Sequence, residues 1–323
     1  MELYSAADPA STVSQPNLEA LLDEISARTP NPIDGIYGPD SLSWRINRES
    51  ALFLGAGRAA LLQLAHPWVA TALAQHSTLL ARPIARFHST FRIVFTMIFG
   101  SLPQALTAAR QLYARHTNVR GEIPQDVGDW QRGAHYEANE ISALRWVHAT
   151  LVESAVFAYE CALSPLTAAE REQYYAESKI LAALCGIPSS ALPENWSAFA
   201  AYNQQMHASG ALCVNDTART MAHNLMAGSG SRIKPPSWYR ALTVEWLPER
   251  FRAEFAFSFG PSEQAVAERA RRRLPRIYKS IPRALRFSGP WHQAQARIAG
   301  RHVGMLTRFS NRFWIGQPLL PFS

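Results

Sequence analysis

Apolar residues in this chain recur at intervals of three and four, which is the spacing of one face of an α-helix. One such stripe runs through residues 140–161, where Leu144, Val147 and Leu151 share a face. A second consists of phenylalanines at strict four-residue spacing: Phe87, Phe91, Phe95 and Phe99. No pair of segments shows the alternation of paired strands, and no internal repeat is present. The pattern predicts an all-α chain built as a single globular multi-helix domain.

Proline, glycine and polar residues divide the chain into three parts. Residues 1–45 are polar and are predicted to form an N-terminal arm with one helix over 17–28. Residues 46–260 are predicted to form the helical domain. Residues 261–323 are predicted to form a basic C-terminal extension that packs on this domain and becomes irregular toward its end.

Helix boundaries follow from caps and breakers. Thr167 and Glu170 have the spacing of a capping box, and the pair His66-Pro67 is expected to interrupt a helix. We expect helices over 59–75 with that interruption, and over 87–99, 102–117, 140–161, 168–186, 195–227, 238–255 and 263–273.

Composition argues against several classes of protein. Three cysteines in 323 residues, far apart and without CxxC spacing, argue against a disulfide framework, a thiolate zinc site and covalent c-type haem. No run approaches the ~18 apolar residues of a membrane-spanning helix. Residues 1–30 lack the basic and apolar segments of a secretory signal, so we expect a cytoplasmic protein. The net charge of +7 favours anionic ligands or surfaces and does not by itself indicate nucleic acid.

The segment Ser50–Gly121 contains no aspartate or glutamate, yet it holds seven arginines and four histidines. A solvated helical region normally mixes both signs of charge. Two interpretations remain open: these cations bind an anionic ligand, or they form a basic surface that faces solvent or another chain of an oligomer.

Several catalytic and cofactor motifs are absent or incomplete. Gly55 and Gly57 match part of the dinucleotide-binding turn, but that site needs an acidic residue about twenty positions further on, and this segment has none. We therefore reject a Rossmann site. The chain also lacks a GxSxG elbow, an HExxH motif and a Walker lysine.

Histidine is the chemistry that remains. Arg145 and His148 stand three residues apart, so they share one helix face. His148 is either a core imidazole with both nitrogens hydrogen-bonded or a metal ligand. A buried haem needs an axial ligand, basic groups for its propionates and apolar walls, and the chain offers each kind of residue. A non-haem metal bound by several histidines competes with this interpretation and usually recruits a carboxylate. The nearest candidates are Glu137, Glu140 and Glu153.

Several collinear segments over about residues 45–255 match a known family. They are Leu62–Ala70 with His76-Ser77, His116–Gly121, Trp146–Ser154, Tyr174–Glu177, Leu184–Pro188 and Trp246–Pro248. Through them the chain resembles the bacterial DUF2236 proteins, a family that extends to the MpaB oxygenases and the latex-clearing rubber oxygenases. The resemblance implies a globin-like helical core that holds non-covalent haem b.

The resemblance also implies roles for individual residues. In the latex-clearing members the proximal iron ligand lies in an Arg-x-x-His-Ala motif, which is here Arg145-Trp146-Val147-His148-Ala149. His148 is thus the implied iron ligand, and Arg145 bonds a propionate or fixes the imidazole. Those members carry a distal Arg-x-x-Lys-Thr motif, and the comparable stretch is Tyr113-Ala114-Arg115-His116-Thr117. Because the lysine is replaced and the arginine displaced, rubber cleavage is not carried over.

The leading hypothesis is a haem b oxygenase, or a related oxidoreductase, that acts on a small hydrophobic molecule and dioxygen. A distal donor such as His116 or Arg120 would polarise bound dioxygen as charge develops on it. The predicted catalytic residues are His116, Thr117 and Arg120. The predicted cofactor-binding residues are His148, Arg145, His66, Arg58, Arg115 and Phe95, and the predicted metal ligands are His148 and His116.

Two alternatives remain. One is a haem-binding or sensing protein without turnover, in which His148 and His116 both bind iron. The other is a helical scaffold that has lost the cofactor. Separately, residues 269–286 carry eight basic positions and either dock on anionic membrane lipid or form a solvated helix face.

Overall fold

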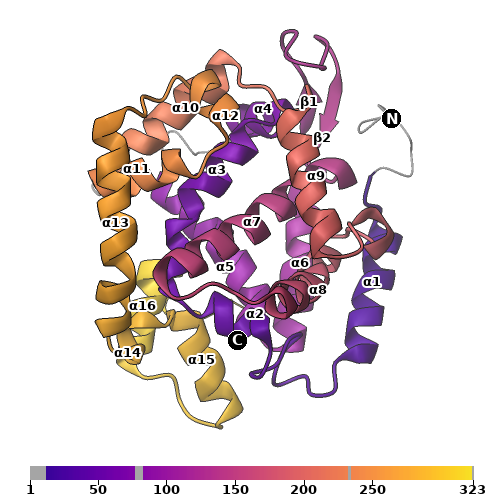
Figure 1. Ribbon diagram of the computed structural model, residues 1–323. Coiled ribbons are helices and arrows are strands. Elements are labelled where there is room, and N and C mark those ends of the chain that lie inside the picture. The colour runs from indigo at the N-terminus through magenta and orange to yellow at the C-terminus, as the bar shows by residue number, and fades with distance from the viewer. Residues whose placement is uncertain (1–11, 77–82, 232–233, 322–323) are drawn as a thin grey trace.

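Helix α7 (Ile141–Ala162) lies at the centre of the fold (Figure 1). The structure is a computed structural model that describes residues 12–76, 83–231 and 234–321. Helices α3 (Ala56–Leu64), α8 (Ala168–Leu184) and α13 (Pro261–Ser280) pack against α7, as does the 3₁₀ turn η2 (Ser50–Leu54). Neighbours on several sides bury several faces of α7, which explains why its sequence is apolar over most of its length.

The other elements surround this centre. The N-terminal half adds α1 (Gln15–Arg28), α2 (Leu42–Asn47), α4 (Pro67–His76), α5 (Pro83–Phe99) and α6 (Leu102–Thr117). After α8 come η3 (Ser189–Ala191), α9 (Trp196–Ala208), α10 (Asp216–Ala227), α11 (Ser237–Glu245), α12 (Glu249–Glu254), α14 (Arg283–Arg286), α15 (Gly289–Ile298) and α16 (Met305–Ile315). In Figure 1, α1 and α13 lie on opposite sides of the molecule. The all-α prediction is confirmed.

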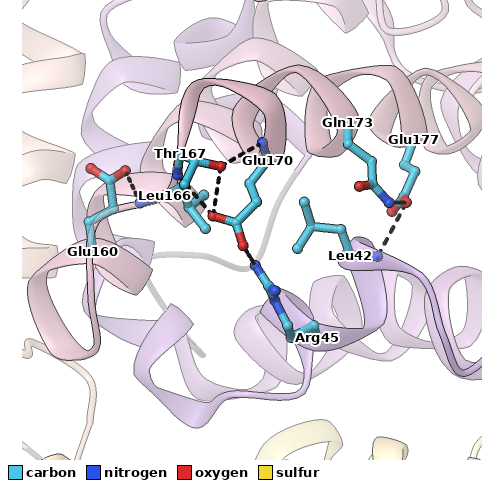
Figure 2. Close-up of polar contacts among 8 residues, drawn as sticks. All are labelled: Leu42, Arg45, Glu160, Leu166, Thr167, Glu170, Gln173 and Glu177. Atoms are coloured by element: carbon cyan, nitrogen blue, oxygen red, sulfur yellow. Dashed lines mark hydrogen bonds and ion pairs between the residues drawn. The ribbon is translucent and has the colours of Figure 1, made fainter.

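The capping box predicted for α8 is present (Figure 2). The Thr167 hydroxyl accepts a hydrogen bond from the Glu170 backbone N–H (3.2 Å), and the Glu170 carboxylate accepts one from the Thr167 N–H (2.8 Å). Glu170 also pairs with Arg45 of α2. Two turns further along α8, the Glu177 carboxylate accepts a hydrogen bond from the backbone N–H of Leu42 at the start of α2 (3.2 Å). Carboxylates of α8 therefore hold α2 in place.

The predicted interruption at His66-Pro67 is confirmed, since α3 ends before it and α4 begins at Pro67. The single helix predicted over 195–227 is wrong. The chain leaves helical conformation between α9 and α10, where Gly210 lies so close to Asp129 that a Cβ would come within 2.1 Å of the carboxylate. Asn215 then caps α10 by accepting a backbone N–H (2.8 Å). Ser209-Gly210 and Asn215 are local stop and capping signals, and the single-helix prediction did not use them.

Three further expectations need correction. The helix predicted over 238–255 is divided into α11 and α12, and Pro248 is the N-cap of the second. The C-terminus is not irregular, because α13 continues through Pro275 to Ser280 and α14, α15 and α16 follow it. No strand pair was expected, yet β1 (Arg120–Glu122) and β2 (His135–Glu137) form a short antiparallel pair.

Both ends of the described chain pack on the domain. Helix α1 lies against α6 and α8, with Leu18 and Leu22 buried, whereas residues 1–11 of the predicted arm lie outside the described residues. Helix α16 packs on α5 and α15, and its Trp314 stacks on Phe53 of η2 with ring centroids 3.8 Å apart. Among the helices described, none is both long enough and apolar enough to span a bilayer.

The two glycines of the rejected nucleotide motif serve helix packing. A Cβ on Gly55 would lie 2.4 Å from the carbonyl oxygen of Ser154 in α7, and a Cβ on Gly57 would lie 2.9 Å from the Tyr239 hydroxyl in α11. Tyr239 also accepts the backbone N–H of Gly57 (3.0 Å). The missing side chains let α3 approach both helices closely.

Candidate functional site

His148 lies about two turns into α7, on the face that packs against α8. Its side chain is buried, with only 6% exposed, and its Nε2 lies 3.0 Å from the carbonyl oxygen of Ser178. A carbonyl oxygen only accepts hydrogen bonds, so Nε2 carries the proton and the neutral ring keeps its lone pair on Nδ1. Among the described residues, Nδ1 has no hydrogen-bond partner.

The surroundings of His148 keep it neutral. Burial lowers its pKa to about 4, against the smaller raising effect of the hydrogen bond to Ser178. At neutral pH the side chain is therefore an uncharged imidazole with a fixed tautomer. Ligand histidines commonly donate their second ring N–H to a carbonyl oxygen in this way.

Arg145 lies one turn before His148 but bonds elsewhere. Its Nη1 donates to the carbonyl oxygen of Ala191 in η3 (3.0 Å), and its guanidinium lies 4.9 Å from the centre of the Tyr202 ring in α9. These contacts join α7 to η3 and α9. The structure thus gives Arg145 partners other than the His148 ring.

His116 lies in the last turn of α6, among positive charges. Burial, together with nearby Arg86 and Arg115, lowers its pKa to about 4, while a hydrogen bond with Asn139 raises it slightly. His116 is therefore also a neutral imidazole at pH 7. The pKa of Arg86 is itself lowered by desolvation and by Arg115, although water reaches its side chain.

The other predicted distal residues are less enclosed. Thr117 is exposed, and its hydroxyl donates to the Tyr113 carbonyl oxygen (3.0 Å) and accepts from Asn139 Nδ2 (3.2 Å). Arg120 is exposed on β1. Arg115 is exposed and contacts the Ser89 hydroxyl across α5 (3.4 Å).

The two candidate metal ligands approach α7 at different points. His116 reaches the start of α7 through Asn139, whereas His148 lies about two turns, or ~10 Å, further along that helix. No hydrogen bond or ring contact joins the two imidazoles in the described structure.

Arg58 has a structural environment. It is 2% exposed, and all three guanidinium nitrogens are used: Nε donates to the Trp246 carbonyl oxygen (2.9 Å), Nη1 to the Ser154 hydroxyl (3.0 Å) and Nη2 to the Glu153 carboxylate (2.6 Å). The guanidinium also lies 4.5 Å from the centre of the Phe157 ring. This buried network joins α3 to α7 and to the end of α11.

His66 and Phe95 lie in aromatic clusters. The His66 ring is fully buried between Trp68 and Trp130, with centroids 6.0 Å and 5.7 Å away, and burial lowers its pKa to about 3. Phe95 is buried beside Phe53 in the cluster that joins α5 to α16.

The residues described contain no group of three His, Cys, Asp or Glu side chains arranged to hold a metal ion. Two of the candidate carboxylate ligands have other partners: Glu153 is paired with Arg58, and Glu140 accepts a hydrogen bond from Ser142. Burial raises the pKa of Glu140 to about 7. The non-haem alternative thus gains no support from the described residues.

Comparison with known protein families gives one match. A family model described as the catalytic domain of the ER-bound oxygenase mpaB/B′ and rubber oxygenase matches residues 44–302. The chain belongs to this family. The match spans α2 to α15 and includes both His116 and His148, so the chain carries an oxygenase-type catalytic domain. Neither the curated proteins nor the solved structures compared with it gave a significant match.

The family match reaches further than the predicted domain of residues 46–260, since it takes in α13, α14 and α15. Two residues of the candidate site, Ser178 and Arg86, were not predicted from the sequence. Ser178 contributes through its backbone carbonyl, which no residue type reveals. Arg86 was only one of seven arginines in the acid-free segment, and only the structure places it beside His116.

Proposed function

We propose that this protein is a haem-dependent oxygenase in which His148 would hold the iron. The observation that carries the proposal is the state of this imidazole: it is buried and neutral, and its Nε2–H is directed to the Ser178 carbonyl oxygen. A neutral ring with one unprotonated nitrogen is the form that binds iron. The family match supplies the oxygenase class.

The charge distribution suits a dicarboxylate cofactor. Arg86 and Arg115 lie near His116, and neither forms an ion pair with a carboxylate in the described structure. Arg58 and Arg110, by contrast, are paired with Glu153 and Glu19. We therefore assign Arg86 and Arg115 to the haem propionates. Arg58, which was predicted among the cofactor-binding residues, has a structural role instead.

The remaining side chains define what the protein contributes. Bound haem supplies the capacity to bind and activate dioxygen. His116 is held neutral, and its ring has one donor and one acceptor nitrogen, one of which hydrogen-bonds with Asn139. Half-buried Phe87 and Phe91 of α5, whose rings contact Phe53, are the apolar surface that we assign to a small hydrophobic substrate. The changed distal motif argues against polyisoprene as that substrate.

The test is the haem content of protein produced with sufficient iron and 5-aminolevulinate. We expect a Soret band in the wild type and in His135→Ala, a control at an exposed histidine. We expect loss of the band in His148→Gly and its return when free imidazole is added. Circular dichroism would show that the variant is folded. A wild type without haem, or a folded His148→Gly with an unchanged spectrum, would refute the proposal.

A second function has one observation in its favour. Because the pKa of His116 is lowered to about 4, it too is available as a neutral ligand. A bis-histidine haem protein without turnover would show a six-coordinate ferrous spectrum that does not change with carbon monoxide. In that case His116→Ala would gain carbon monoxide binding, whereas the oxygenase proposal expects the wild type to bind it already.

A further inference from the structure

Helix α16 presents an apolar face to solvent. Four large apolar side chains share this face and are among the most exposed of the described chain: Met305 (88%), Leu306 (60%), Phe309 (69%) and Phe313 (55%). Their spacing places them within about a third of the helix circumference. Soluble proteins seldom leave contiguous apolar surface of this kind uncovered, and such surface commonly marks an interaction site.

The helix that carries this face is firmly held on its other side. Asn311 and Ile315 are buried, and Trp314 stacks on Phe53. The carbonyl oxygens of Phe313 and Ile315 accept hydrogen bonds from His88 Nε2 (2.9 Å) and Arg92 Nε (3.2 Å) of α5. The exposed face is thus part of a packed helix, at the end of the molecule where α14, α15 and α16 gather (Figure 1).

Positive charge flanks the apolar face. Arg308 and Arg312 lie on the exposed edge of α16, and Arg301 is exposed just before the helix. The whole segment of residues 269–323 contains twelve arginines and lysines and no aspartate or glutamate. Four of these arginines line a recess on α13: Arg269, Arg272, Arg273 and Arg276. The preferred occupant must therefore be apolar and anionic at once.

We propose that the apolar face of α16, flanked by its arginines, docks the protein on the surface of an anionic lipid bilayer. A helix with aromatic and aliphatic residues on one face and arginines beside them lies in the plane of the lipid headgroups and inserts its apolar side chains. The basic segment adds attraction to anionic headgroups.

A second copy of this chain fits the face less well. A symmetric interface on α16 would bring Arg308 and Arg312 of both copies together, and residues 269–323 offer no carboxylate to compensate for them. A bilayer containing acidic phospholipid satisfies both the apolar and the basic part of the surface. The inference does not depend on bound haem.

The test is sedimentation of the full-length protein with vesicles of phosphatidylcholine alone or mixed with phosphatidylglycerol. We expect binding to the mixed vesicles, weakening as salt rises, and at least about tenfold weaker binding by the double variant Phe309→Ser/Phe313→Ser. Ile33→Ser, at an exposed apolar residue outside this surface, is the matched control and should bind like the wild type.

Charge is tested separately. Arg308→Gln/Arg312→Gln should weaken binding to the mixed vesicles, whereas Arg28→Gln, at an exposed arginine of α1, should not. Light scattering would report the oligomeric state of each variant. Equal binding by the wild type and the phenylalanine variant, or no binding by the wild type, would overturn the proposal. A dimeric wild type that becomes monomeric in that variant would instead assign the face to self-association.

Discussion

The Nε2 of His148 lies 3.0 Å from the carbonyl oxygen of Ser178, so a side chain of α7 is oriented by the backbone of α8. This contact fixes which ring nitrogen carries the proton. Substituting Ser178 would not remove this hydrogen bond, because the acceptor is a backbone atom. The orientation of the proposed ligand is consequently a property of how the two helices pack.

The tautomer of His148 can be measured directly. In haem-free protein at pH 7 we expect ¹⁵N NMR to show a neutral ring protonated on Nε2, titrating at about pH 4. Between pH 6.5 and 4 the unfolded chain binds a proton at this residue that the folded chain does not. His148 therefore makes folding less favourable as pH falls through this window, by ~3 kcal/mol in all. A ring protonated on Nδ1, or titrating above pH 6, would contradict this expectation.

Glu140 should have the opposite pH dependence. Its pKa is raised to about 7, so between pH 4.5 and 7 the folded chain binds a proton that the unfolded chain has lost. Stability then decreases as pH rises through this window. We expect Glu140→Gln to be more stable than the wild type above pH 7, by up to ~3 kcal/mol, and similar to it at pH 4.5. Urea unfolding at several pH values measures this, with Glu122→Gln as an exposed control; a constant difference across pH would disprove it.

The Arg58 network should be important for stability. Replacing Arg58 with alanine leaves the Glu153 carboxylate without its partner in a largely buried position. We expect a loss of about 3–5 kcal/mol in the free energy of unfolding. Arg110→Ala, which breaks an exposed pair with Glu19, should cost about 1 kcal/mol or less. Similar losses in the two variants would show that the buried Arg58 network stabilises the fold no more than the exposed pair does.

Close packing at Gly55 gives a steric prediction. Alanine there places its Cβ 2.4 Å from the Ser154 carbonyl oxygen, a backbone atom that cannot move without shifting α7. We expect Gly55→Ala to lower the free energy of unfolding by about 1–3 kcal/mol. Gly304 also precedes a helix, but no atom lies within 4 Å of its added Cβ, so Gly304→Ala controls for capping. If the two variants lose equal stability, the close contact is not the cause.

Local features of the fold could be read from the sequence. The bounds of α6, the capping box of α8 and the interruption at His66-Pro67 all follow from interactions within a few residues along the chain. The close approach of Gly210, between α9 and α10, to Asp129 could not be predicted this way, because the two residues are distant in sequence.

The same distinction applies to the candidate site. The helix that carries His148, its apolar neighbours and the arginine-rich region around His116 could all be predicted, because they are properties of residue type and spacing. Two features became visible only in the folded chain: Arg58 donates hydrogen bonds to Glu153, Ser154 and Trp246, and the His148 proton faces Ser178. Burial and hydrogen-bond partners arise where distant segments meet, and they set the charge, tautomer and availability of each side chain.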